Sequence, residues 1–177
     1  MNVSTGFMTV EEFLRLPNPV EGHLELHHGE VVLMPPPKRG HQRIQKRLVR
    51  LLQAAARATD AVEIEMAFRP SPNHEVWQAD VGLVSLEREA STPDDEYLSG
   101  APELVVEVLS PSNTVDEITD KLNVCLANGC LSFWVVDPKF RQVSVTEGDL
   151  TRHYRGSASI PCSLLDGNIS VEDLFRD

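Results

Sequence analysis

The pattern of apolar and polar residues at the start of the chain predicts a short helix followed by a hairpin. Thr9 and Glu12 have the spacing of a capping box, which opens a helix, and Pro17 ends it. The stretch HLELHHGEVVLMPPP then carries two apolar strands on either side of a His-Gly turn, and its proline run ends the second strand. We therefore expect an N-terminal β-hairpin.

A longer amphipathic helix is predicted from His41 to Ala58. Its apolar residues recur at helical spacing and form one stripe: Ile44, Leu48, Leu51, Leu52 and Ala55. At about 100° per residue, a group of basic residues lies nearly opposite that stripe: Arg43, Lys46, Arg47, Arg50 and Arg57. This basic face is either an ordinary solvated helix surface or a surface that contacts phosphates.

The rest of the chain alternates between apolar runs and turn-rich stretches. The same criteria predict strands over 62–68, 76–86, 103–109 and 132–137, an acidic loop over 87–101, a helix between Thr114 and Gly129, a closing hairpin over 141–154 and a short helix over 171–175. This order predicts an α+β (α/β) fold in which a mixed β-sheet is flanked by helices. The length favours a single domain over residues 1–177.

Composition places the chain among ordinary globular proteins, with 41% hydrophobic and 24% charged residues. No apolar run approaches the roughly 20 residues that a membrane span needs, and the N-terminal stretch lacks the regions of a signal peptide. We therefore expect a cytoplasmic protein without a membrane partner. Cys125, Cys130 and Cys162 form no CxxC pair, which predicts free, buried thiols.

The net charge of -11 argues against a nucleic-acid partner, because phosphate affinity comes largely from Lys and Arg. The basic residues are unevenly distributed, however. Seven of the 16 lie between Lys38 and Arg57, and no Asp or Glu falls in that window. One basic segment therefore stands out in an otherwise acidic chain.

Two carboxylates lie inside apolar strands. Asp80 is in VWQADVGLV, and Glu107 is in ELVVEVL, where it shares a face with Val105 and Leu109. A charge in a buried strand costs several kcal/mol unless it is paired, protonated or bound to a metal. The pattern therefore indicates that both acids have partners.

Lys121 lies on the helix that follows Glu107, at the edge of the face that turns towards the sheet. Two acids and a lysine at one sheet edge suit a divalent cation and an activated water. A structural ion pair of Lys121 with Glu107 or Asp80 explains the same residues. The residues by themselves leave both interpretations open.

An acid followed by a second acid in a β-strand and then x-Lys resembles the PD-(D/E)XK nuclease pattern. Ala79 stands where that pattern has proline, and Leu109 stands where it has lysine. A variant of the pattern moves the lysine to the following helix, and Lys121 fits that position.

The chain as a whole is similar to the Uma-two family of bacterial endonucleases. The matching stretches run in family order over residues 8–138: MTVEEFLRLP, LELHHGEVVLMPPP, HQRIQKRL, QADVGLV, APELVVEVLSPSN, DKLNVCLANG and FWVVDP. The resemblance implies a restriction-endonuclease-like fold.

The resemblance also implies roles for individual residues. Asp80 and Glu107 would bind Mg²⁺ or Mn²⁺ with a backbone carbonyl near Leu109, and Lys121 would position the attacking water. Glu25 and His41 match family positions of the same site. The alternatives are an ordinary hairpin residue for Glu25 and a local hydrogen bond at the helix start for His41.

The function expected from this resemblance is magnesium-dependent hydrolysis of phosphodiester bonds in DNA. Cleavage of both strands usually takes two active sites, and C2 dimers are the commonest oligomers, so we expect a homodimer. The apolar hairpin near Val31–Met34 offers a contact surface. The alternative is a nuclease-fold module that binds a partner without nuclease activity, which the net charge favours.

Overall fold

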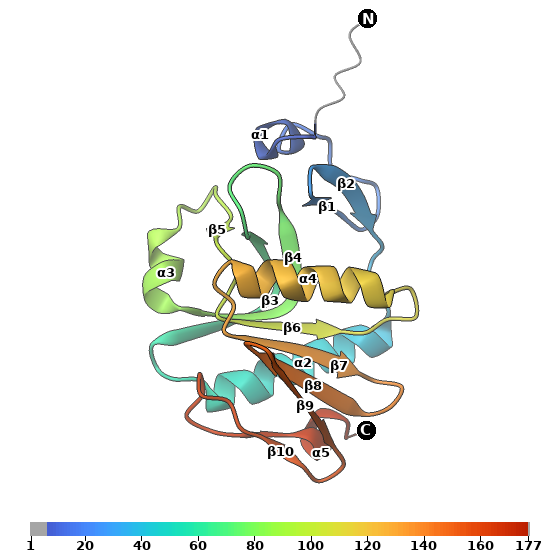
Figure 1. The fold of residues 1–177 in the computed structure, drawn as a ribbon, viewed down its shortest axis with the longest axis vertical. Coiled ribbons are helices and arrows are strands. Elements are labelled where there is room, and N and C mark those ends of the chain that lie inside the picture. The colour runs from blue at the N-terminus through green and yellow to red at the C-terminus, as the bar shows by residue number, and fades with distance from the viewer. Residues whose placement is uncertain (1–6, 177) are drawn as a thin grey trace, which may run out of the picture.

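The computed structural model describes residues 7–176. Residues 1–6 and 177 lie outside this range. Part of the N-terminal stretch in which we expect no signal peptide therefore lies outside the described residues. A seven-stranded mixed sheet in the order β5-β3-β4-β6-β7-β8-β9 forms the centre of the molecule (Figure 1). Its strands are β3 (Asp60–Arg69), β4 (Trp77–Ser85), β5 (Leu98–Ser99), β6 (Leu104–Val108), β7 (Ser132–Asp137), β8 (Gln142–Glu147) and β9 (Leu150–Arg155).

Most neighbouring strands of this sheet are antiparallel, but β3 with β5 and β6 with β7 are parallel. The parallel β6–β7 connection runs through helix α4 (Val115–Ala127), as a parallel crossover requires. The α+β fold with a mixed sheet and flanking helices is therefore confirmed.

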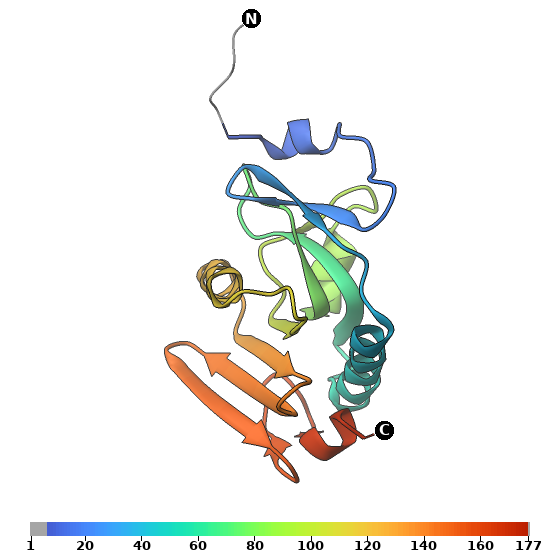
Figure 2. The ribbon, with the colours of Figure 1, turned by 90° about the vertical axis from the view of Figure 1, so that its right-hand side faces the viewer.

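Helices cover both faces of the sheet (Figure 2). On one side, α2 (Arg39–Ala55) and α5 (Val171–Leu174) pack on the α2-side core, in which Leu48 and Leu52 meet Val106. On the other side, α4 packs on the α4-side core, in which Cys125 meets Val105. Every residue of β6 is buried, as expected of a central strand covered on both faces.

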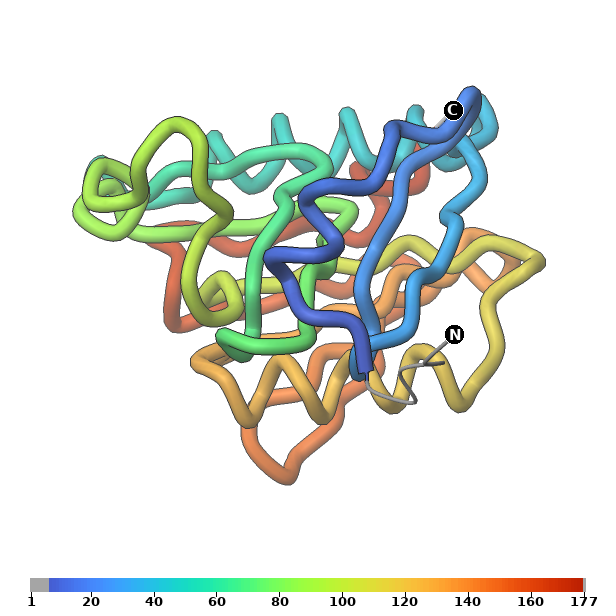
Figure 3. Tube along the Cα trace, turned by 90° about the horizontal axis from the view of Figure 1, so that it is seen from above, coloured from blue at the N-terminus to red at the C-terminus, as the bar shows by residue number. Residues whose placement is uncertain are grey.

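The N-terminal segment forms a separate layer at one end of the sheet. Helix α1 (Val10–Phe13) opens with the predicted capping box, and β1 (His23–His27) pairs with β2 (Glu30–Met34) in the predicted hairpin. Leu26, in β1, and Val76, which directly precedes β4, exchange two backbone hydrogen bonds. These bonds join the hairpin to the large sheet. Seen from above (Figure 3), the hairpin reaches from the α2 side of the sheet towards α4.

The prediction of a loop over 87–101 is wrong, because the segment contains part of α3 (Leu86–Ser91) and all of β5. The Ser85 side chain caps α3, and the Arg88 guanidinium donates to the carbonyls of Ser99 and Ala101. These hydrogen bonds order the segment, although its acidic sequence offers few apolar contacts.

Several smaller features complete the fold. A second two-stranded sheet pairs β10 (Ser159–Ile160) with β11 (Ile169–Ser170). All three cysteines are free and buried, as predicted. Within the described residues, no helix has the length and apolar character to cross a membrane.

Candidate active site

Asp80 and Glu107 lie at the same end of the pairing between β4 and β6. Val81 and Val106 are the last paired residues at this end, and Asp80 and Glu107 are the next residues along the two strands. The backbone N–H of Val108 donates to Asp80 Oδ2 at 2.7 Å. The structure therefore brings the two acids together at one end of the β4–β6 ladder.

The backbone is distorted where Asp80 lies. Ala79 packs in the α4-side core, whereas Val81 packs in the α2-side core, although residues two apart normally share a face of a strand. Glu65, across from Asp80 in β3, has a φ of 55°, a region that non-glycine residues rarely adopt. Strain of this kind costs on the order of 1–3 kcal/mol and concentrates at functional sites.

Helix α2 supplies two partners for Asp80. His41 Nε2 lies 2.8 Å from Asp80 Oδ1, and Gln45 Nε2 donates to the same oxygen at 2.8 Å. The His41 bond thus joins residues 39 positions apart rather than neighbours in the helix. Burial by itself would lower the pKa of His41, but the hydrogen bond to Asp80 and the charge of Asp80 outweigh it and raise this pKa.

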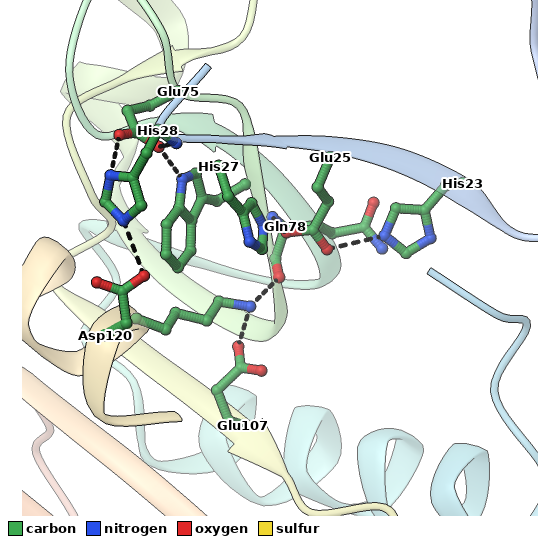
Figure 4. A network of polar contacts seen from close by, with 10 residues as sticks. His23, Glu25, His27, His28, Glu75, Gln78, Glu107 and Asp120 are labelled. Atoms are coloured by element: carbon green, nitrogen blue, oxygen red, sulfur yellow. Dashed lines mark hydrogen bonds and ion pairs between the residues drawn. The ribbon is translucent and has the colours of Figure 1, made fainter. Parts of the chain in front are cut away.

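Lys121 lies against Glu107 on the other side of the sheet. Its Nζ is 2.9 Å from Glu107 Oε1 and donates to the Gln78 carbonyl at 2.6 Å (Figure 4). Lys121 and Cys125 are the two buried residues of α4. The lysine therefore lies in the middle of the inward face of α4, not at its edge as the helical spacing predicted.

Acidic side chains outnumber the single lysine at this site. Burial raises the pKa of Glu107 to about 7, with Lys121 opposing the rise and Asp80 and Glu25 adding to it. Burial would lower the pKa of Lys121, but Glu107, Glu25 and Asp80 outweigh it and raise that pKa. Glu25, Asp80 and Glu107 thus surround one ammonium, and histidines contact two of these carboxylates. Such a cluster of acids favours a bound proton or cation.

Glu25 joins this group of charges from the hairpin. Its carboxylate lies 3.0 Å from His23 Nε2 and 2.8 Å from His27 Nε2, and it accepts the Gln78 N–H at 3.3 Å. Burial would raise its pKa, but Lys121 and the two histidines hold the pKa well below its usual range. Glu25 is therefore a buried, ionised residue beside the Gln78 peptide that holds Lys121.

A second network, which the sequence did not suggest, ties the hairpin to α4 (Figure 4). His28 Nδ1 lies 2.9 Å from Glu75 Oε1, and His28 Nε2 lies 2.8 Å from Asp120 Oδ2. Glu75 also accepts the Trp77 indole N–H. Asp120 directly precedes Lys121, so His28 fixes the turn of α4 that carries the lysine. The only signal in the sequence was the His-His pair at the hairpin turn, which resembles a surface turn.

The donor set fits a hard divalent cation. The described residues contain no group of three or more His, Cys, Asp or Glu side chains arranged for a metal, but Mg²⁺ commonly takes one or two carboxylates and keeps several waters. Glu107 Oε1 is buried without a hydrogen bond of good geometry, even though the Lys121 ammonium is 2.9 Å away. The ion pair is thus close but poorly directed, which leaves Glu107 Oε1 a lone pair for a further partner.

Two comparisons with known proteins found matches to this chain. A family model named Uma2 and described as "Putative restriction endonuclease" matches residues 10–176. Among solved structures, a crystal structure described as a putative nuclease belonging to DUF820, from Anabaena variabilis ATCC 29413, has a TM-score of 0.81 and 22% sequence identity. The match covers 95% of this chain and 97% of the other, and at this identity it shows a shared fold. The comparison with curated proteins found no match.

Proposed function

The chain belongs to the Uma2 family, described as putative restriction endonucleases, and from this premise we propose that it hydrolyses phosphodiester bonds in DNA. The observation that carries the proposal is the meeting of Asp80, Glu107 and Lys121. Asp80 accepts the Val108 N–H of β6 at 2.7 Å, next to Glu107 on that strand, and the lysine approaches Glu107 to 2.9 Å. An ion pair that served stability alone would not need the second acid beside it.

Asp80 and Glu107 would hold Mg²⁺ or Mn²⁺. When bound, such a cation supplies Lewis-acid stabilisation of phosphate oxygens and lowers the pKa of a bound water. His41 and Gln45 orient Asp80, as partners of ligating carboxylates commonly do.

Lys121 has a separate role in this proposal. The Gln78 carbonyl and Glu107 hold its ammonium in place, so its charge is positioned before substrate arrives. A preorganised cation of this kind orients the attacking water or stabilises negative charge in the transition state. Glu25 keeps Lys121 charged through its own carboxylate and acts as a positioning residue.

The test is cleavage of mixed DNA and RNA substrates with and without Mg²⁺ or Mn²⁺. We expect wild type to cut DNA only with the cation, Asp80→Ala to lose cleavage, and Lys121→Met to bind DNA but lose most cleavage. Equal cleavage by wild type and Asp80→Ala would contradict the proposed site. DNA binding without cleavage by wild type under any divalent cation would instead support the interaction module.

We also propose that the protein forms a homodimer through the β1–β2 hairpin. Val31 and Leu33 support it, because they project from β2 with 39% and 59% of their surfaces exposed. Strand β2 pairs only with β1 within the described residues and so presents a free edge.

A further inference from the structure

A cavity of about 740 Å³ lies beside the candidate active site. Its walls come from the first turns of α2, the loop after β6, the β7–β8 turn and the C-terminal residues. His41 lines the cavity and bonds Asp80 at 2.8 Å. His41 therefore connects the cavity to Asp80, although neither acid lines the cavity itself.

The lining of this cavity is strongly cationic. Five of its sixteen residues are Lys or Arg and none is Asp or Glu, in a chain whose net charge is -11. Lys38, Arg43 and Arg47 come from the start of α2, Arg141 comes from the β7–β8 turn, and Arg176 comes from the C-terminal end. Residues far apart in the sequence thus contribute one sign of charge, which selects an anionic ligand.

Two of these arginines are fixed in place. Arg47 donates to the Leu174 carbonyl at 3.0 Å, and Arg141 donates to the Phe175 carbonyl at 2.6 Å. Arg141 also has a φ of 49°, a strained conformation for a residue with a side chain. Lys38 and Arg43 are exposed and form no salt bridge within residues 7–176, so their charges remain for a ligand.

Much of the remaining cavity wall is apolar. It is formed by Pro35, Pro36, Ile44, Leu109, Pro111, Pro138 and Phe175. The hydroxyls of Ser110 and Ser112 lie 2.8 Å apart and satisfy each other. Apolar walls with cations around them suit a ligand that carries both a base and a phosphate, and such contacts do not read base edges.

The size of the cavity favours unpaired over paired nucleic acid. Cavities of roughly 300–1,000 Å³ enclose small ligands, whereas a duplex keeps its bases stacked inside and presents only its phosphates. Enzymes that act on an enclosed base first take it out of the stack. An unpaired strand can place both phosphate and base in this cavity.

We propose that the cavity binds an unpaired strand of nucleic acid, without sequence preference, and leads it to Asp80 and Glu107. The placement of the scissile phosphate rests on the proposed nuclease function, but the binding of the strand does not. The protein thus acts on single-stranded or locally opened nucleic acid rather than on an intact duplex.

The test is fluorescence anisotropy with a labelled mixed-sequence oligonucleotide, as single-stranded DNA, as single-stranded RNA or as a duplex, in a metal chelator that prevents cleavage. Lys38→Glu/Arg43→Glu reverses two cavity charges. Lys46→Glu/Arg50→Glu is the matched control, because it makes the same charge change on exposed residues of α2 that do not line the cavity. Thermal melts verify that both variants fold.

We expect wild type to prefer either single strand over the duplex, with affinity that falls steeply with salt. The cavity variant should weaken single-strand binding by about tenfold or more, and the control by less than about threefold. Stronger binding of the duplex, equal losses in both variants, or no binding of single strands would overturn the proposal. If the cleavage assay with Mg²⁺ or Mn²⁺ succeeds but the cavity variant binds single strands like wild type, the cavity proposal alone is overturned. If the cavity variant loses binding but wild type cuts nothing in that assay, the nuclease function alone is overturned.

Discussion

At the residue scale, the role of Lys121 follows from what its removal leaves behind. Its ammonium pairs with Glu107, whose side chain is 11% exposed. Because burial and neighbouring carboxylates already raise the pKa of Glu107 to about 7, loss of Lys121 should raise it further. Glu107 then either takes up a proton or remains as an uncompensated buried charge.

We therefore predict that Lys121→Met destabilises the metal-free protein in a pH-dependent way. When the pKa of an acid is higher in the folded than in the unfolded protein, the protein loses stability as pH rises between the two pKa values. The difference from wild type should be small up to about pH 7 and reach at most about 1.4 kcal/mol at pH 8, because one pH unit above the wild-type pKa is worth about 1.4 kcal/mol. Chemical denaturation in a chelator measures it, and Lys121→Met/Glu107→Gln should recover most of the loss. A cost independent of pH would contradict this account.

At the scale of secondary-structure elements, His28 links the hairpin to α4. The hydrogen bond to Asp120 is the largest influence on its pKa, and Glu75 adds to it, so the pKa of His28 is raised against the opposing effect of burial. A raised histidine pKa contributes stability that is complete below the unfolded pKa and is lost as pH rises through the folded pKa.

We predict that His28→Asn lowers the melting temperature most near pH 5–6 and progressively less towards pH 9. Asparagine is a suitable replacement because it tolerates the positive φ of 51° at this position. Asp120→Asn removes the same contact from the other side, so the double variant should cost less than the sum of the single variants. Additive losses would show that His28 and Asp120 do not act as a pair.

At the scale of the whole molecule, a bound cation should stabilise the fold. A ligand that binds only the folded state contributes RT ln(1 + [L]/Kd), or about 2.7 kcal/mol at a hundredfold excess over Kd. We predict that Mg²⁺ or Mn²⁺ raises the melting temperature of wild type but not of Asp80→Ala. The same rise in both proteins would place the cation elsewhere on this acidic chain.

Assembly is the second property at this scale. We predict that wild type is a dimer by light scattering at micromolar concentration and that Val31→Glu/Leu33→Glu is a monomer. Both side chains are exposed, so charge there should repel a second copy without disturbing the core. A monomeric wild type would remove the dimer from the proposal, and a dimeric variant would place its interface on another surface.

Much of this protein was determined by local sequence pattern. Periodicity predicted α2 and α4, the capping boxes predicted the starts of α1 and α4, and charges inside apolar runs identified Asp80 and Glu107. These features depend on residues a few positions apart, where helical and strand geometry fixes which side chains share a face. The acidic segment after β4 was misjudged because long-range bonds from Arg88, not its own pattern, order it.

Only the tertiary structure decided how these pieces meet. The bond of His28 to Asp120 joins residues 92 positions apart, and no periodicity in the sequence relates them. The same holds for His41 with Asp80, for the central position of Lys121 and for the cavity whose cations come from three parts of the chain. Local pattern fixes which face of a helix or strand a side chain occupies. The packing of sheet and helices determines which other side chain lies opposite, because packing depends on the buried contacts of the whole chain at once.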